Sequence, residues 1–135
     1  MGAKVLFIGN YTDSETYDLI IKKGIRDLSQ AARLFQQRLI NNLACLSDNF
    51  KAVSLLPTDK STNLPETIEE ARNRVDVIPV INGSAKSMIE AMHRLRDLVI
   101  IQCGKDTTVL MYAVNPIALI PLLKLKKKYR LKLVT

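Results

Sequence analysis

The feature of this 135-residue sequence that most constrains its fold is a regular alternation of short apolar segments with longer amphipathic ones. The short segments are rich in Val, Ile and Leu, which is typical of strands buried on both faces of a sheet. The longer segments repeat apolar residues every three or four positions, which is typical of helices with one buried side. This alternation predicts a parallel sheet with helices on its faces.

The bounds of the segments follow from the same pattern. Five segments are predicted to be strands: 4–9, 51–57, 76–82, 108–115 and 131–135. Three are predicted to be helices: 25–46, 85–102 and 116–129. Pro79 lies inside the third strand and suggests an edge position, because proline cannot donate a hydrogen bond to a neighbouring strand. The prediction is one α/β domain over residues 1–135, Rossmann-like, with an open parallel sheet of about five strands and helices on both faces.

Two polar segments and two apolar stripes complete this prediction. Residues 10–18 predict a long loop, and residues 58–74 predict a loop with a short helical turn after Pro65. Asn115 followed by Pro116 predicts a capped helix start. The residues expected to face the core are Ile25, Leu28, Ala32, Phe35, Leu39, Leu43 and Leu46 in the first helix and Met88, Met92, Leu95 and Val99 in the second.

The positive charge of the chain is concentrated near its C-terminus. The formal net charge is +7, and six cations lie close together: Lys124, Lys126, Lys127, Lys128, Arg130 and Lys132. A nucleic-acid-binding domain would usually carry a broader basic face, so nucleic acid is not an expected partner. Two interpretations of the cluster remain open. It is either the solvated end of a helix, where cations are favoured by the dipole, or a patch that attracts anionic lipid.

The sequence offers little for metal, cofactor or nucleophilic chemistry. Cys45 and Cys103 lie far apart and are expected to be free thiols, mostly packed in the interior, in a reducing compartment. His93 is the single histidine and is expected to be a surface or half-buried residue, so neither a zinc site nor a Ser-His pair is proposed. No signal peptide and no apolar run of about 20 residues is present, which favours a cytoplasmic protein.

Familiar phosphate-binding motifs are also missing. The dinucleotide fingerprint G-x-G-x-x-G is absent, and "CGKDTT" lacks the upstream glycine of a phosphate loop. We therefore predict no catalytic residue, no metal and no cofactor on this chain.

A ligand of an open parallel sheet is expected at the carboxyl ends of the strands, near the point where strand order reverses. The candidate acceptor- or substrate-binding residues at that rim are Gly9, Asn10, Tyr11, Thr12, Asn82 and Asn115. Each also has a structural interpretation: Gly9 as a turn residue, the Asn82-Gly83-Ser84 segment as a turn before a helix cap, and Asn115 as a cap.

The order of segments resembles the N-terminal half of bacterial glycosyltransferases with the GT-B fold, especially the large retaining family four. The resemblance rests on "KVLFIGNY", a long polar loop, a helix of the pattern Ser-x-Ala-Ala-x-x-Phe-x-x-x-Leu-Ile-x-x-Leu, and the closing "NPIALIPLLKLKKKYRLKLV". The helix pattern is carried by Ser29, Ala31, Ala32, Phe35, Leu39, Ile40 and Leu43. The resemblance spans the whole chain, and the motifs that carry it are loose apolar patterns.

The resemblance implies a function and a missing partner. In such enzymes the N-terminal half mainly holds the acceptor, here a sugar or lipid-linked acceptor, and a C-terminal domain binds the nucleotide-sugar. Nothing like the paired-glutamate donor motif of that second domain occurs here, so we expect the chain alone to transfer no sugar. The resemblance also favours peripheral attachment at the inner face of the membrane through the basic cluster.

Two alternatives follow for the chain as a whole. It is either an N-terminal fragment or split subunit of a glycosyltransferase, cut near Thr135, or a free-standing flavodoxin-like module that binds a ligand or a partner. Continuation of the reading frame into a second α/β domain would favour the first.

Overall fold

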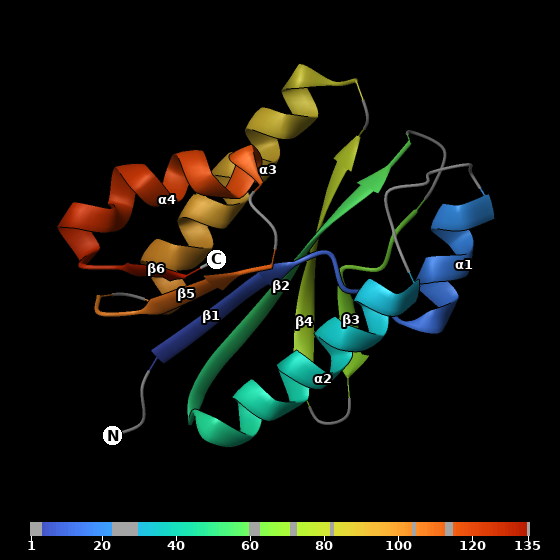
Figure 1. The fold of residues 1–135 in the computed structure, drawn as a ribbon. Helices are drawn as coiled ribbons and strands as arrows, with labels where there is room; N and C mark the ends of the chain where they lie inside the picture. The colour runs from blue at the N-terminus through green and yellow to red at the C-terminus, as the bar shows by residue number, and fades with distance from the viewer. Residues whose placement is uncertain are drawn as a thin grey trace.

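A computed structural model describes residues 4–22, 30–59, 63–70, 73–81, 83–103, 105–112 and 115–134. Its centre is an open sheet of six strands in the order β3-β4-β2-β1-β5-β6 (Figure 1). The strands are β1 (Lys4–Gly9), β2 (Asn49–Thr58), β3 (Thr67–Glu70), β4 (Asn73–Ile81), β5 (Thr108–Met111) and β6 (Lys132–Val134). All pairs are parallel except β3 with β4. The predicted α/β class with a mostly parallel sheet is confirmed.

Helices cover both faces of the sheet (Figure 1). They are α1 (Ser14–Lys22), α2 (Gln30–Leu46), α3 (Ala85–Leu98) and α4 (Pro116–Tyr129), and α3 runs into a π-helical turn, Val99–Cys103. Figure 1 shows α1 and α2 on one face, and α3 and α4 on the other. None of the helices in the described ranges is long and apolar enough to cross a membrane.

Strand β1 lies in the middle of the sheet and separates two apolar clusters. Leu6 and Ile8 face α3 and α4, whereas Phe7 faces the cluster that contains Ile20 of α1 and Ile40 of α2. Successive side chains of a strand point to opposite faces, so a continuous apolar run fills two cores at once. This explains why "LFI" is apolar without alternation.

Two predictions were wrong because capping and pairing were overlooked. Part of the predicted loop 10–18 belongs to α1, which begins after Asp13, whose Oδ1 accepts a hydrogen bond of 2.8 Å from the N–H of Thr16. The predicted helical turn after Pro65 is strand β3, which pairs antiparallel with β4 and buries Ile68 at its centre. A lone buried residue between polar ones fits a short edge strand as well as a helical turn.

Pro79 lies in β4, which has neighbours on both sides. The partner β3 covers β4 only from Asn73 to Asp76, and the N–H of Val77 still reaches the carbonyl of Glu66 at 2.9 Å. Alternate residues of a strand donate to the same side, so the nitrogen of Pro79 faces the side that β3 has already left. The prediction of an edge position is correct for this residue but not for the whole strand.

The predicted core-facing stripes need correction. In α2 the buried residues are Gln36 and Ile40, whereas Phe35 is 55% exposed and Leu46 is 83% exposed. In α3, Leu95 is buried as predicted, but Met88 is exposed. Cys45, expected in the interior, is exposed. An apolar stripe fixes the period of a helix, but the rotation of the helix about its axis decides which of two adjacent rows is buried.

Candidate functional site

The strand order reverses between β1 and β5, which are adjacent and parallel. From β1 the chain crosses to β2 on the face of α1 and α2. From β5 it crosses to β6 on the face of α4 (Figure 1). Connections that leave two neighbouring strands toward opposite faces leave a crevice between them, where ligands of such sheets bind. The carboxyl ends of β1 and β5 are therefore the candidate site.

At the end of β1, the side chain of Gln36 on α2 makes two hydrogen bonds with Asn10. Its Oε1 accepts a hydrogen bond of 3.0 Å from the backbone N–H of Asn10, and its Nε2 donates one of 2.7 Å to Asn10 Oδ1. Gln36 is 1% exposed and Asn10 is half-buried, so the two hydrogen bonds are partly shielded from water and fix the orientation of the Asn10 amide. Within the described residues, Asn10 Nδ2 has no protein partner and remains free to donate to a ligand.

Gly9 is required for the same contact. A Cβ at this position would collide with Gln36 Oε1 and would lie 2.8 Å and 2.9 Å from two ring atoms of Phe7. The missing side chain lets Gln36 approach the end of β1. Gly9 therefore acts through the position of Gln36 and has no side chain to offer a ligand.

Tyr11 and Thr12 follow in the predicted site segment, but both are 1% exposed. Tyr11 belongs to the apolar cluster under α1 and α2, and its carbonyl accepts a hydrogen bond of 2.7 Å from the hydroxyl of Ser54 on β2. In this conformation the Tyr11 side chain packs the loop against the sheet, and the Thr12 side chain is also withdrawn from solvent. Their predicted contact with a substrate would need the loop to open.

An aromatic pair lies next to the crevice. Tyr112 directly follows β5, and its N–H donates a hydrogen bond of 2.9 Å to the carbonyl of Ile8 on β1. Its ring contacts that of Phe35 on α2, with the centroids 5.7 Å apart and the planes tilted by 34°. Since Phe35 is 55% exposed, this pair presents an apolar ring surface to solvent, and Phe35 directly precedes Gln36, the residue that binds Asn10.

Asn115 caps α4, as the sequence predicts, because its Oδ1 accepts a hydrogen bond of 2.9 Å from the N–H of Ile117. It lies between β5 and α4, after the strand that is the neighbour of β1. Asn82 lies outside the described residues. The neighbouring Gly83 and Ser84 follow β4, which is three strand spacings from β5, or about 14 Å. The predicted rim therefore divides into a β1/β5 part and a separate β4 part.

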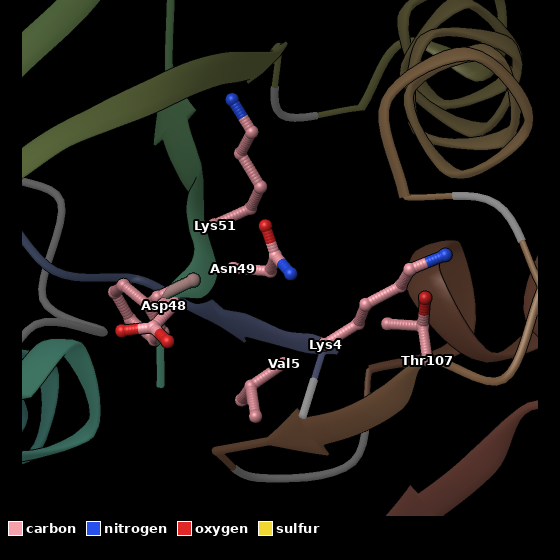
Figure 2. A pocket seen from close by; sticks show the side chains of 7 residues that line it. Lys4, Val5, Asp48, Asn49, Lys51 and Thr107 are labelled. Carbon is pink, nitrogen blue, oxygen red and sulfur yellow. The ribbon is translucent and has the colours of Figure 1, made fainter. Parts of the chain in front are cut away.

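Besides a hollow of about 510 Å³ beside β4 and α3, lined by Arg74, Asp76, Arg94 and Asp97 among others, two smaller hollows lie near the ends of the strands in the described part of the molecule. One of about 320 Å³ is at the amino ends of the strands, lined by Lys4, Asp48, Asn49, Lys51 and Thr107 among others. Figure 2 shows that the ammonium groups of its two lysines point in different directions and do not converge on one point. The other, of about 280 Å³, is at the ends of β2 and β4 beside Asp59, Glu90 and Arg94. In parallel sheets the amino end is rarely the ligand side.

The six cations of the basic cluster are all exposed, and they differ in their contacts. Arg130 ends α4 in a left-handed conformation, with φ 51°, and its guanidinium donates to Asp106 at 2.8 Å. The ammonium of Lys128 lies 5.7 Å from the ring centre of Tyr129. His93 is exposed on α3, as expected.

Three residues of the crevice escaped the sequence prediction: Gln36, Phe35 as an exposed residue, and Tyr112. Ala32, Gln36 and Ile40 recur every four positions, and a glutamine in such a row indicates a polar contact inside the fold. Tyr112 was assigned to an apolar strand that ends earlier, at Met111.

Comparison of the chain with protein-family models, with curated proteins and with solved structures found no match in any of the three. The described residues contain no group of three His, Cys, Asp or Glu side chains that could hold a metal ion. The chemistry offered by the crevice is thus that of amides, a hydroxyl and aromatic rings.

Proposed function

We propose that this domain is the acceptor-side half of a GT-B glycosyltransferase, and that the crevice at β1 and β5 contacts the sugar of a glycan or lipid-linked acceptor. The observation that carries the proposal is the exposed Phe35–Tyr112 ring pair together with Gln36, the next residue of α2 after Phe35, which holds the amide of Asn10. A sugar ring has apolar C–H faces and a rim of hydroxyl groups. Aromatic rings with a few placed polar groups suit both.

The sheet topology supports the same proposal. The parallel strands run in the order β4-β2-β1-β5-β6, the arrangement of a Rossmann-like half. The sequence resemblance to family four covers β1, α2 and α4, including Phe35. Topology by itself gives a place and not a reaction, so the proposal depends on the chemistry of the crevice.

In this proposal a second domain binds the nucleotide-sugar and closes the cleft. The sequence of this chain has no phosphate-binding loop and no donor motif. Sugar transfer needs donor and acceptor held together away from water, which one open rim does not provide. We therefore expect no turnover of a sugar nucleotide by the chain alone, and turnover would contradict the proposal.

Saturation-transfer NMR with a panel of mono- and disaccharides and of nucleotide-sugars tests the proposal. We expect transfer to the C–H protons of a saccharide, and its loss in Phe35→Ala. The matched control is Leu46→Ala, which removes another exposed apolar side chain of α2, at the C-terminal end of the helix and away from the crevice. Flavin mononucleotide binding without any saccharide binding would favour a flavodoxin-like module instead.

A further inference from the structure

A second surface, separate from the crevice, follows from the distribution of charge. The chain has 20 Lys and Arg and 13 Asp and Glu, and the last acid is Asp106. Six of the 20 cations follow Asp106, and the other 14 share the rest of the chain with all 13 acids, Asp106 included. Almost all the excess positive charge therefore belongs to α4 and to the residues that follow it.

The exposed side of α4 combines this charge with apolar side chains. Two rows of exposed residues start from Ile120: one continues to Leu123 and Lys127, the other to Lys124 and Lys128. The spacings of three and four place both rows on one side of the helix. Ile120 is 43% exposed and Leu123 is 54% exposed. The opposite side is buried in the core through Ala118, Pro121, Leu122 and Leu125.

Helix capping does not account for this surface. The dipole favours Lys126, Lys127 and Lys128, which lie in the last turn. It does not explain Lys124, one turn earlier, or the two exposed aliphatic side chains beside it. Within the basic cluster, Arg130 forms an ion pair with Asp106. The five lysines of the cluster have no acidic partner among the described residues.

We propose that the outer side of α4 docks on an anionic lipid surface, with Lys124, Lys127 and Lys128 at the headgroups and Ile120 and Leu123 at the acyl boundary. Charge complementarity and the exposed aliphatic residues argue for this occupant together. Lysine attracts anionic headgroups without needing a fixed geometry, and aliphatic groups gain from leaving water at the interface. A nucleic acid would use the charge but not Ile120 and Leu123.

Vesicle co-sedimentation of the purified protein tests the surface. The vesicles are phosphatidylcholine alone and phosphatidylcholine mixed with phosphatidylglycerol, each at low and high salt. We expect binding only to the mixed vesicles, and we expect salt to weaken it because the attraction is screened. At about 1 kcal/mol per lysine, the triple variant K124Q/K127Q/K128Q should lower vesicle affinity about a hundredfold.

Two further variants make the result specific. The variant K22Q/K51Q/K86Q changes the net charge by the same amount at exposed lysines away from α4 and should retain binding. The variant I120S/L123S should weaken binding to the mixed vesicles and leave any binding to double-stranded DNA unchanged. Circular dichroism checks that all three variants stay folded.

The docking proposal fails if the mixed vesicles do not bind, if both triple variants lose binding equally, or if I120S/L123S has no effect. The assay contains no saccharide, so it is independent of the crevice. Loss of saccharide binding with retained vesicle binding would overturn only the proposed function, and the reverse result would overturn only the docking surface.

Discussion

The two helical layers of this domain pack on opposite faces of the same sheet and differ in how many residues each helix buries. In the layer of α3 and α4, each helix has 14 residues and buries four of them. Both helices are capped at their starts, by Ser84 and Asn115. In the other layer, α2 has 17 residues and buries two, one of which is the polar Gln36. The longer helix thus contributes less to the core.

The difference separates stability from candidate function. The α3/α4 layer fills its side of the sheet with aliphatic residues, so its core is expected to carry most of the packing energy. On the other side, one of the two buried positions of α2 is the polar Gln36, and Phe35 is exposed near the reversal of strand order between β1 and β5. Residues that break the local rules of packing are more often functional than structural. The α2 side is therefore where ligand contact is expected.

The largest expected effect is in the α3/α4 layer and uses two adjacent leucines of α4. Leu122 is 0% exposed and Leu123 is 54% exposed. Leu122→Ala should lower the free energy of unfolding by about 2–5 kcal/mol, because it leaves a cavity. Leu123→Ala should change it by less than about 0.5 kcal/mol. Urea denaturation measures the free energy of unfolding of both variants. Equal losses of stability would show that α4 does not bury Leu122 and expose Leu123.

The next effect is at the point where α2 meets β1. Gly9→Ala should cost about 1–3 kcal/mol, because the new methyl group collides with Gln36 and with the ring of Phe7. In the background of Gln36→Ala the cost of Gly9→Ala should fall, since one of the two obstacles is gone. Strictly additive losses in a double-mutant cycle would mean that Gly9 and Gln36 do not meet.

A smaller effect is expected at the cap of α4. Asn115→Ala removes the acceptor for the N–H of Ile117 and should cost about 1 kcal/mol, while Asn115→Ser should restore most of the stability. Thermal melting of the two variants provides the measurement. If serine were no better than alanine, Asn115 would have a role other than capping.

The smallest effect on stability is expected at Phe35. Its side chain is 55% exposed and packs against Tyr112 at the surface, so Phe35→Ala should change the free energy of unfolding by less than about 0.5 kcal/mol. The same substitution should abolish saccharide contact. A large loss of stability would instead place Phe35 in the core and remove the contrast between the two layers.

Much of the fold could be predicted from the sequence, because each strand of the parallel sheet is a continuous apolar run such as residues 4–9. The start of α4 was also predictable, since Asn115 and Pro116 form a local signal. The burial of Gln36 in place of Phe35 was not, because it depends on how α2 is rotated over the sheet. The contact of Phe35 with Tyr112 joins residues 77 positions apart, 112 − 35, and no local pattern indicates it.

The central claim is that ligand contact occurs at the ends of β1 and β5, on the side of α2. An NMR titration of backbone and side-chain amides with a bound saccharide tests it most directly. We expect the largest chemical-shift changes at Asn10, Gln36, Tyr112 and Asn115. Shifts gathered instead around Lys4, Lys51 and Thr107 at the opposite edge (Figure 2), or around Asp59 and Arg94, would contradict it.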